Sequence, residues 1–236
     1  MQYTSARSMS PVINAPESTR TAFIVKVYQH LALAVGAFVA LETVLFITGV
    51  AEAMFDFFAR SGGFAWLLLL GGVSIVQWFA ARSISKIDDV GAQYVGLFAT
   101  AGAQALIFAP FLYYVFNYSA GGTSSVVSAA VVTLLGFAGL SVVAFVTRRD
   151  LGFLRPIVMY GFVAALVLII AGVIFGFELG VLFSVAMVGL AGAAILYQTQ
   201  DIIRRYPEWA YVAAAVSLFS SLMTMFWYIL RIFSRR

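Results

Sequence analysis

The side chains best suited to chemistry in this sequence are the few polar ones that fall inside long apolar runs. Glu42 lies deep in the first run, either as a neutral, hydrogen-bonded acid or as an acid that faces a water-filled cavity. An ionisable group inside a membrane costs a few kcal/mol or more, so it is a functional candidate by default. Glu42 is therefore a candidate for an ion pathway or for its sensor.

Two further polar groupings stand near the end of the chain. Gln198 and Asp201 close the sixth apolar run, and their spacing of three places them on one face of a helix. In the last run, Ser217 and Thr224 belong to a stripe of small and hydroxylated side chains at spacings of three and four, together with Ala213, Ser220 and Ser221. Such a stripe suits either a helix packed among its neighbours or one that lines a narrow polar path.

The sequence lacks the groups that common intramembrane enzymes need. It contains no cysteine, and its single histidine, His30, lies near one end of the first run. A serine protease needs a histidine base across the bundle, and Ser141 lies in a Gly-Leu-Ser-Val context without the second glycine of the usual motif. An aspartyl protease would need paired aspartates inside the runs, and a retinal Schiff base would need a lysine in the last run. Both are missing. We therefore expect a protein that is not an enzyme and that uses no metal or other cofactor.

These polar groups sit in a chain that is otherwise suited to lipid. Of its 236 residues, 63% are apolar and 10% are charged, whereas soluble domains are about 45–50% apolar and about 25% charged. So few charges cannot cover a water-facing surface. The composition predicts a membrane protein that contacts the lipid bilayer, and the net charge of +4, clustered between apolar runs, indicates membrane topology and not nucleic-acid binding.

Seven apolar stretches are long enough to cross a bilayer as helices, which takes about 20 residues each. They cover approximately residues 23–47, 64–84, 94–116, 126–147, 156–175, 179–197 and 210–233. Strands of a membrane barrel would be shorter and would alternate apolar with polar residues, whereas Val163–Ile170 is continuously apolar. The sequence predicts an all-α membrane protein with a bundle of seven transmembrane helices over residues 21–236, and the connections are too short for a separate soluble domain.

Residues 1–20 form a polar segment without an apolar core of its own. A secretory signal has a charged start that is followed at once by a hydrophobic stretch, and this segment does not fit that pattern. We expect a short, disordered N-terminal tail that is not cleaved.

Positive charges predict how the bundle lies in the membrane, because cytoplasmic loops retain Lys and Arg during insertion. Ten of the fourteen such residues fall on the side of the N-terminus: Arg7, Arg20, Lys26, Arg82, Lys86, Arg148, Arg149, Arg155, Arg204 and Arg205. The N-terminus should therefore be cytoplasmic. Seven full spans would place Arg231, Arg235 and Arg236 outside, so either the earlier loops override them or one apolar segment does not cross fully.

Three segments of the chain stand out: residues 147–154 (TRRDLGFL), residues 195–203 (ILYQTQDII) and residues 217–231. Together they resemble the Bax inhibitor-1 family. The first segment is similar to the basic–basic–Asp loop after that family's fourth helix. Residues 195–203, ILYQTQDII, are similar to its LYDTQ-x-II segment, and residues 217–231 are similar to its final-helix pattern. The resemblance covers residues 21–236 and implies a seven-helix bundle whose last helix is central.

Several members of that family resemble pH-sensitive calcium leak channels in which two buried aspartates, one from each of the last two segments, share a proton. Two like charges at close range cannot both ionise, so such a pair can act as a pH sensor. In this sequence Gln198 and Ser221 stand where the two aspartates are expected. Neither side chain titrates in the working range, and neutral groups are poorer calcium ligands than carboxylates. The resemblance therefore does not carry the proton-sharing switch over intact.

Arg82 resembles a family arginine that pairs with the two aspartates in a closed state. Because the carboxylates are missing here, we expect Arg82 to pair with Asp201 or with Asp88. The alternative is an ordinary positive charge at the cytoplasmic end of a helix.

The missing acids make the chain similar to a bacterial branch of the family that includes a modulator of the membrane protease FtsH. The first hypothesis is therefore a non-enzymatic, multi-pass protein of the bacterial inner membrane that modulates an FtsH-type protease or a stress response, with residues 1–20 as an accessible tail. The alternative is a pH-sensitive calcium or cation leak along the Ser217–Thr224 stripe, with Asp201 or Glu42 as a displaced sensor of protons.

Overall fold

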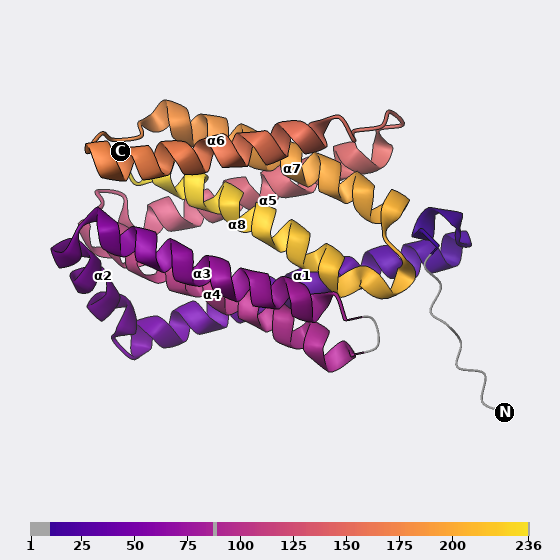
Figure 1. The fold of residues 1–236 in the computed structure, drawn as a ribbon, viewed down its shortest axis with the longest axis horizontal. Helices are drawn as coiled ribbons and strands as arrows, with labels where there is room; N and C mark the ends of the chain where they lie inside the picture. The colour runs from indigo at the N-terminus through magenta and orange to yellow at the C-terminus, as the bar shows by residue number, and fades with distance from the viewer. Residues whose placement is uncertain (1–9, 87–88, 236) are drawn as a thin grey trace.

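The computed structural model describes residues 10–86 and 89–235. In this part of the chain, seven helices are long and apolar enough to span a membrane. They are α1 (Glu17–Ile47), α3 (Gly63–Ile84), α4 (Val90–Tyr118), α5 (Gly122–Val146), α6 (Leu154–Phe175), α7 (Val181–Arg205) and α8 (Tyr211–Phe233), as Figure 1 shows. The predicted all-α bundle of seven apolar helices is confirmed.

The helices follow the apolar runs because backbone groups find no water in lipid and must bond to one another within each run. α7 is the main difference, since it continues past the predicted end at Tyr197 as far as Arg205. It stops where Tyr206 adopts the extended conformation that Pro207 imposes on its predecessor. A short 3₁₀ helix, η2 (Glu208–Ala210), then leads into α8.

The apolar runs do not predict α2 (Val50–Ser61), which is too short to span a membrane. It lies between Gly49 and Gly62, whose φ angles of 74° and 68° suit glycine and let the chain turn sharply at both ends. Phe58 of α2 is buried and stacks on Trp66 of α3, with 4.7 Å between ring centroids. α2 connects α1 to α3 at the end of the bundle opposite the start of α1 (Figure 1).

α8 and α4 form the centre of the bundle. Inside their most apolar windows, 61% and 56% of the residues are buried, against 11–33% in the other spans. Phe108 of α4 stacks on Phe226 of α8 and meets the edge of Trp227, with 5.4 and 5.0 Å between ring centroids. α8 also packs against α1, α5 and α7, and it runs through the middle of the molecule in Figure 1. The predicted central position of the last helix is confirmed.

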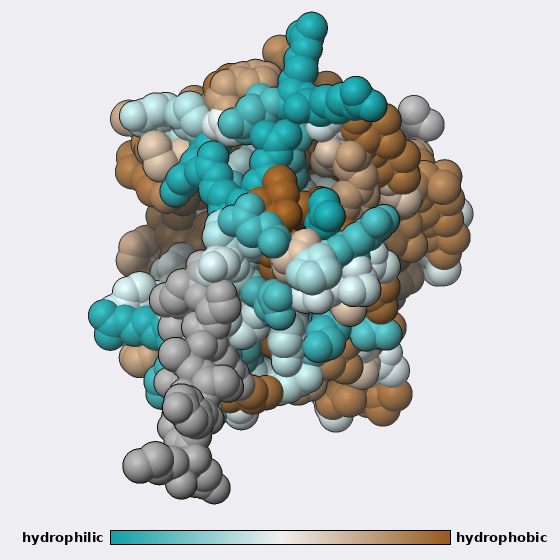
Figure 2. Space-filling model, turned by 90° about the vertical axis from the view of Figure 1, so that its right-hand side faces the viewer, coloured by the Kyte–Doolittle hydropathy of each residue, from teal (hydrophilic) through white to brown (hydrophobic). Residues whose placement is uncertain are grey.

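The two ends of the bundle carry different groups. The start of α1 and the connections α3–α4, α5–α6 and α7–α8 meet at one end, where hydrophilic side chains gather in Figure 2. α8 crosses the bundle fully and ends on the other side. There Arg231 donates to the backbone oxygen of Leu179 at 2.9 Å, and Arg235 pairs with Glu178 at 3.5 Å. Arg231 and Arg235 therefore lie at the end of the bundle opposite the start of α1, and Arg236 lies outside the described residues.

The segment before α1 is folded from Ser10 onwards, although residues 1–20 were predicted as a tail. It contains a 3₁₀ helix, η1 (Val12–Asn14), and α1 begins at Glu17. Val12 is fully buried, and its N–H donates to the backbone oxygen of Tyr206 at 2.9 Å. Burying a valine side chain stabilises the fold by about 1.5–3 kcal/mol. The mainly polar composition of residues 1–20 gives no sign of this contact. We call this contact the Val12 anchor; the other residues of the predicted tail, 1–9, lie outside the described residues.

Candidate functional site

Gln198 and Ser221 lie in direct contact between α7 and α8. The Ser221 hydroxyl donates to Oε1 of Gln198 at 2.9 Å, and Ser221 is buried. The contact forms because α7 and α8 are packed neighbours joined by the short connection of residues 206–210, so that side chains on their facing sides come together. By the helical rise of 1.5 Å per residue, Gln198 lies about 10 Å inside the end of α7 at Arg205.

The Gln198–Ser221 pair is neutral in both partners. An amide and a hydroxyl exchange a hydrogen bond but hold no titrating proton near neutral pH. The pair therefore links the central helix to α7 without the charge repulsion that two carboxylates would create at the same distance.

Asp201 lies nearer the polar end and pairs with Arg205 on its own helix, with 2.8 Å between Oδ1 and Nε. Both line a polar cavity of about 130 Å³ together with Asp150, Gly152, Tyr197, Gln200 and Arg204. At the turn beside it, burial first and the Asp201 charge second raise the pKa of the Tyr206 phenol above its ordinary value, so this phenol stays neutral. Asp201 is thus placed for an ion pair at the end of the bundle, beyond the Gln198–Ser221 pair.

Gln200 was not among the predicted site residues, yet it fixes the α5–α6 connection. Its Oε1 accepts from the N–H of Leu151 at 2.7 Å, and its Nε2 donates to the backbone oxygens of Arg149 and Thr147 at 2.8 and 3.3 Å. The two family-like segments 147–154 and 195–203 therefore form one contact unit. The polar run Gln-Thr-Gln-Asp at residues 198–201 indicated a candidate site in the sequence. The spacing of residues along the chain could not show that the α5–α6 connection packs against it.

The predicted pairing of Arg82 with Asp201 is contradicted. The Arg82 guanidinium lies over the ring of Trp78, 3.6 Å from its centroid, while Asp201 is bound by Arg205. Trp78 precedes Arg82 by one helical turn, so the cation–π contact forms within α3 itself. α3 packs mainly against α4, which leaves Arg82 exposed at the edge of the bundle. Asp88, the other predicted partner, lies outside the described residues.

Glu42 is buried in α1, with 7% of its surface exposed. It continues the buried stripe of Phe38, which packs edge-on against Phe108 of α4. Among the described residues neither carboxylate oxygen has a hydrogen-bond partner, so the predicted alternative of a hydrogen-bonded acid is not observed. Burying a carboxyl group without a partner is costly, and Glu42 therefore keeps its place as a functional candidate.

The stripe on α8 divides into two kinds of hydroxyl. Ser217, Ser220 and Thr224 donate to backbone oxygens of their own helix at 2.9, 3.0 and 2.8 Å. Ser221 alone of these four bonds to another helix in the described part of the chain. Hydroxyls bonded within their own helix are satisfied without a partner on another helix, and a role of Ser217 and Thr224 in an ion pathway stays a prediction.

Comparison with known proteins adds family evidence to this geometry. Residues 20–236 match the model of the family described as "Inhibitor of apoptosis-promoting Bax1". An uncharacterized protein of Pseudomonas aeruginosa is 34% identical over 142 residues, which are 59% of this chain and 62% of that protein. The "Modulator of FtsH protease YccA" of Escherichia coli is 31% identical over 162 residues, 68% of this chain and 70% of the relative. "Protein LIFEGUARD 4" of Arabidopsis thaliana is 29% identical over 239 residues, 96% of this chain and 90% of the relative.

The family match runs from residue 20, inside α1, through the other six spans, and it includes Gln198 and Ser221. It agrees with the resemblance that the three sequence segments indicated and with the central α8 of the bundle. The chain therefore belongs to the Bax inhibitor-1 family of membrane proteins.

Proposed function

We propose that this protein is a non-enzymatic modulator of an FtsH-type protease in a bacterial inner membrane. The observation that carries the proposal is the Gln198–Ser221 hydrogen bond, a neutral contact at the place where the family resemblance leads us to expect a titrating acid pair. The 31% identity to a protein named as a modulator of FtsH protease supports the same role. Modulation by binding needs a membrane-embedded surface and an accessible segment, and it needs no catalytic residues.

The proposal places the N-terminus in the cytoplasm. Positive residues gather at the polar end of the bundle, in the α5–α6 connection and at the end of α7, and positive loops stay in the cytoplasm during insertion. The Val12 anchor joins the N-terminal segment to the fold at this same end. Residues 1–9 precede this anchor in the chain, and the proposal assigns to them the contact with the protease.

The test uses an FtsH-type protease and a membrane substrate that it degrades. The full chain should co-purify with the protease and slow degradation of the substrate, whereas a chain without residues 1–9 should reach the membrane in equal amount and lose most of the slowing. Because the Val12 anchor and the start of α1 belong to the fold, the deletion stops at residue 9. A chain in which a Gly/Ser sequence of equal length replaces residues 1–9 controls for length.

Two results would count against the proposal in different ways. Equal protection by the full and the shortened chain would remove the role of residues 1–9. A full chain that neither binds the protease nor slows degradation would remove the proposed function itself.

A calcium or cation leak remains the second candidate function, and Glu42 is the observation that favours it. A buried carboxyl group without a hydrogen-bond partner is a group that a proton or a cation would stabilise. Vesicles that contain the protein and a calcium dye test this candidate at mildly acidic and mildly alkaline pH. Flux no greater than in empty vesicles rejects the leak, and a pH dependence unchanged in Glu42→Gln and in Asp201→Asn rejects these residues as sensors.

A further inference from the structure

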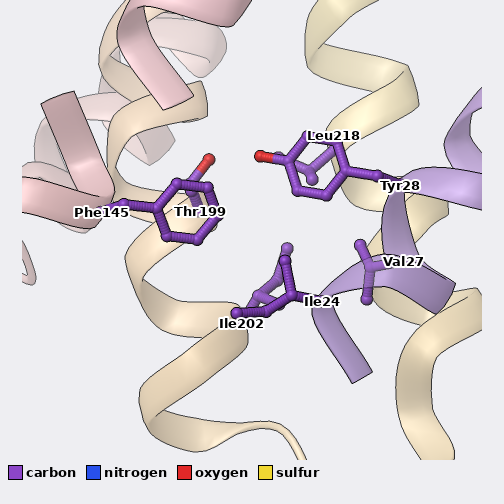
Figure 3. A pocket seen from close by; sticks show the side chains of 7 residues that line it. All are labelled: Ile24, Val27, Tyr28, Phe145, Thr199, Ile202 and Leu218. Carbon is purple, nitrogen blue, oxygen red and sulfur yellow. The ribbon is translucent and has the colours of Figure 1, made fainter. Parts of the chain in front are cut away.

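The polar cavity that contains the Asp201–Arg205 pair lies between the end of α7 and the α5–α6 connection (Figure 1). Its volume of about 130 Å³ is roughly ten times what one water molecule needs, so a small ligand group can enter. Four of its lining residues are charged: Asp150, Asp201, Arg204 and Arg205. The cavity between α1 and α7 in Figure 3 differs from it, because none of the residues that line that cavity is charged. Of the two cavities, the one at the end of α7 therefore suits a charged ligand.

The segments around this cavity carry more positive than negative charge. Residues 147–155 and 197–205 include its whole lining, and they contain five arginines and two aspartates, which leaves a net charge of +3. The arginines are Arg148, Arg149, Arg155, Arg204 and Arg205. Their summed field at this end of the bundle favours an anion as the ligand.

Arg204 and Arg205 keep unused capacity to bind an anion. Nη1 of Arg204 lies 3.5 Å from Oδ1 of Asp150, whereas a strong hydrogen bond between charged groups measures about 2.7–2.9 Å. The same Oδ1 accepts from the N–H of Gly152 at 2.8 Å. Arg205 pairs with Asp201 through Nε, and in the described part of the chain its two Nη atoms have no hydrogen-bond partner. Because a guanidinium offers a planar fork of donors, both side chains suit the paired oxygens of a phosphate group.

Apolar side chains next to the cavity indicate that this phosphate group belongs to a lipid. Val146 ends α5, and Phe153 and Ile157 lie at the start of α6. All three side chains are exposed. In a membrane, exposed apolar side chains contact the acyl chains of lipids. A phospholipid can place its phosphate group in the cavity while its chains contact these residues, whereas a free phosphate ion would gain nothing from them.

We propose that the cavity binds the phosphate group of an anionic phospholipid, with Arg204 and Arg205 as the main donors. Basic pockets between membrane helices are typical sites for anionic head groups. Tyr197 also lines the cavity, and its hydroxyl can donate a further hydrogen bond. Gly152 leaves room for the head group, since a Cβ atom there would lie 3.3 Å from Nη2 of Arg205.

The bound lipid holds the α5–α6 connection against the end of α7, where Gln200 already joins the two. The lipid site is independent of the proposed function, because it concerns the membrane around α7 and not a protease.

The first experiment measures binding of phosphatidylglycerol to the purified full chain in a neutral detergent by native mass spectrometry. The Arg204→Gln/Arg205→Gln variant should bind this lipid about tenfold more weakly, because two charge-assisted contacts are lost. Arg148→Gln/Arg149→Gln is the matched control, since it removes the same charge from the same connection but neither residue lines the cavity. Its affinity should stay within about twofold of the native value. Equal losses in the two variants would overturn the site, because binding would then depend on net charge alone.

A second variant, Arg204→Lys/Arg205→Lys, keeps both positive charges and a partner for Asp201, so it tests the site even where the glutamine variant does not fold. Lysine lacks the planar fork of donors, so this variant should also bind phosphatidylglycerol more weakly than the native chain. Native affinity in the lysine variant would overturn the assignment of the two guanidinium groups as donors.

The second experiment identifies the source of the phosphate group. Phosphatidylcholine carries the same phosphate group with a compensating positive charge, and it should bind about tenfold more weakly than phosphatidylglycerol. Inorganic phosphate at the same concentration as the lipid should leave the amount of bound phosphatidylglycerol unchanged. Equal binding of the two lipids would overturn the preference for an anionic head group. Displacement of phosphatidylglycerol by inorganic phosphate would overturn the lipid as the ligand.

Discussion

At the scale of single residues, the partner of each polar side chain decides what it contributes. Ser221 reaches Gln198 on the neighbouring helix, whereas Ser217 bonds to a backbone oxygen of its own helix. We predict that Ser221→Ala lowers the free energy of unfolding by about 1 kcal/mol, because the amide oxygen of Gln198 loses its donor. Ser217→Ala should change it by less than about half as much. Thermal unfolding in nanodiscs measures both, and equal effects would argue against a structural link between α7 and α8.

A substitution at Glu42 should change the free energy of unfolding in the opposite direction. Its carboxyl group is buried without a hydrogen-bond partner among the described residues, so an apolar side chain of similar size removes a cost. We expect Glu42→Leu to raise the free energy of unfolding by about 1–3 kcal/mol. The same change at the exposed Glu208 should stay within about 0.5 kcal/mol of zero. A loss of stability in Glu42→Leu would show that the carboxyl group is satisfied in the membrane.

At the scale of elements, the Val12 anchor holds η1 against the α7–α8 turn. Val12 is fully buried, whereas Ile13 beside it is 42% exposed. We predict that Val12→Ala speeds amide hydrogen exchange in residues 12–15 by about tenfold or more, because it removes most of the burial that fixes η1. Ile13→Ala is the control and should leave the exchange close to that of the native protein. Equal exchange in both variants would mean that Val12 does not anchor the segment.

α3 and α4 approach closely at Gly96. A Cβ atom placed there would lie 2.5 Å from Cγ1 of Ile84 and 2.7 Å from the backbone oxygen of Ala80. Gly96→Ala should therefore lower the free energy of unfolding by about 1–3 kcal/mol, since the two helices must move apart. In the same helix, a Cβ at Gly102 would have Leu41 as its nearest neighbour, at 3.9 Å, so Gly102→Ala should be tolerated. Thermal unfolding of the two variants checks this difference, and equal losses would contradict the close approach.

The existence of the spans could be predicted from the sequence because length and hydropathy decide it, as in Val163–Ile170. α2 could not, because an amphipathic helix of 12 residues lies below the length that the apolar-run criterion tests. The same criterion misses Val12, because one buried apolar side chain in a polar segment is not a long apolar run. Contacts between distant elements were predicted only where the family resemblance placed two residues together, as for Gln198 and Ser221.

The partners of Arg82 and Gln200 show why the rest of the site escaped prediction. Arg82 was expected to bond across the bundle, but Trp78 offers a partner within the same helix. Gln200 bonds to three backbone groups of the α5–α6 connection, and backbone groups carry no signature in the sequence. Both outcomes depend on which helices are neighbours, and composition and spacing do not determine this.

At the scale of the whole molecule, the bundle buries a neutral contact beside its central helix and gathers its charges at the ends. α8 is the most buried span, and its Ser221 bonds to α7. The polar end holds the Val12 anchor and the Asp201–Arg205 pair, while Arg231 and Arg235 are fixed at the other end. This arrangement suits a stable membrane-embedded binding partner whose interior does not respond to protons through the Gln198–Ser221 pair.

The most direct measurement of that central claim is calcium flux into dye-loaded proteoliposomes at mildly acidic and mildly alkaline pH. It compares the native protein with the Gln198→Asp/Ser221→Asp double variant, with empty vesicles as the baseline and an ionophore to show that the dye responds. For the native protein the account predicts no flux above the baseline at either pH, and a pH-dependent flux only after both acids are introduced. A pH-dependent calcium flux through the native protein that persists in Glu42→Gln and in Asp201→Asn would contradict it.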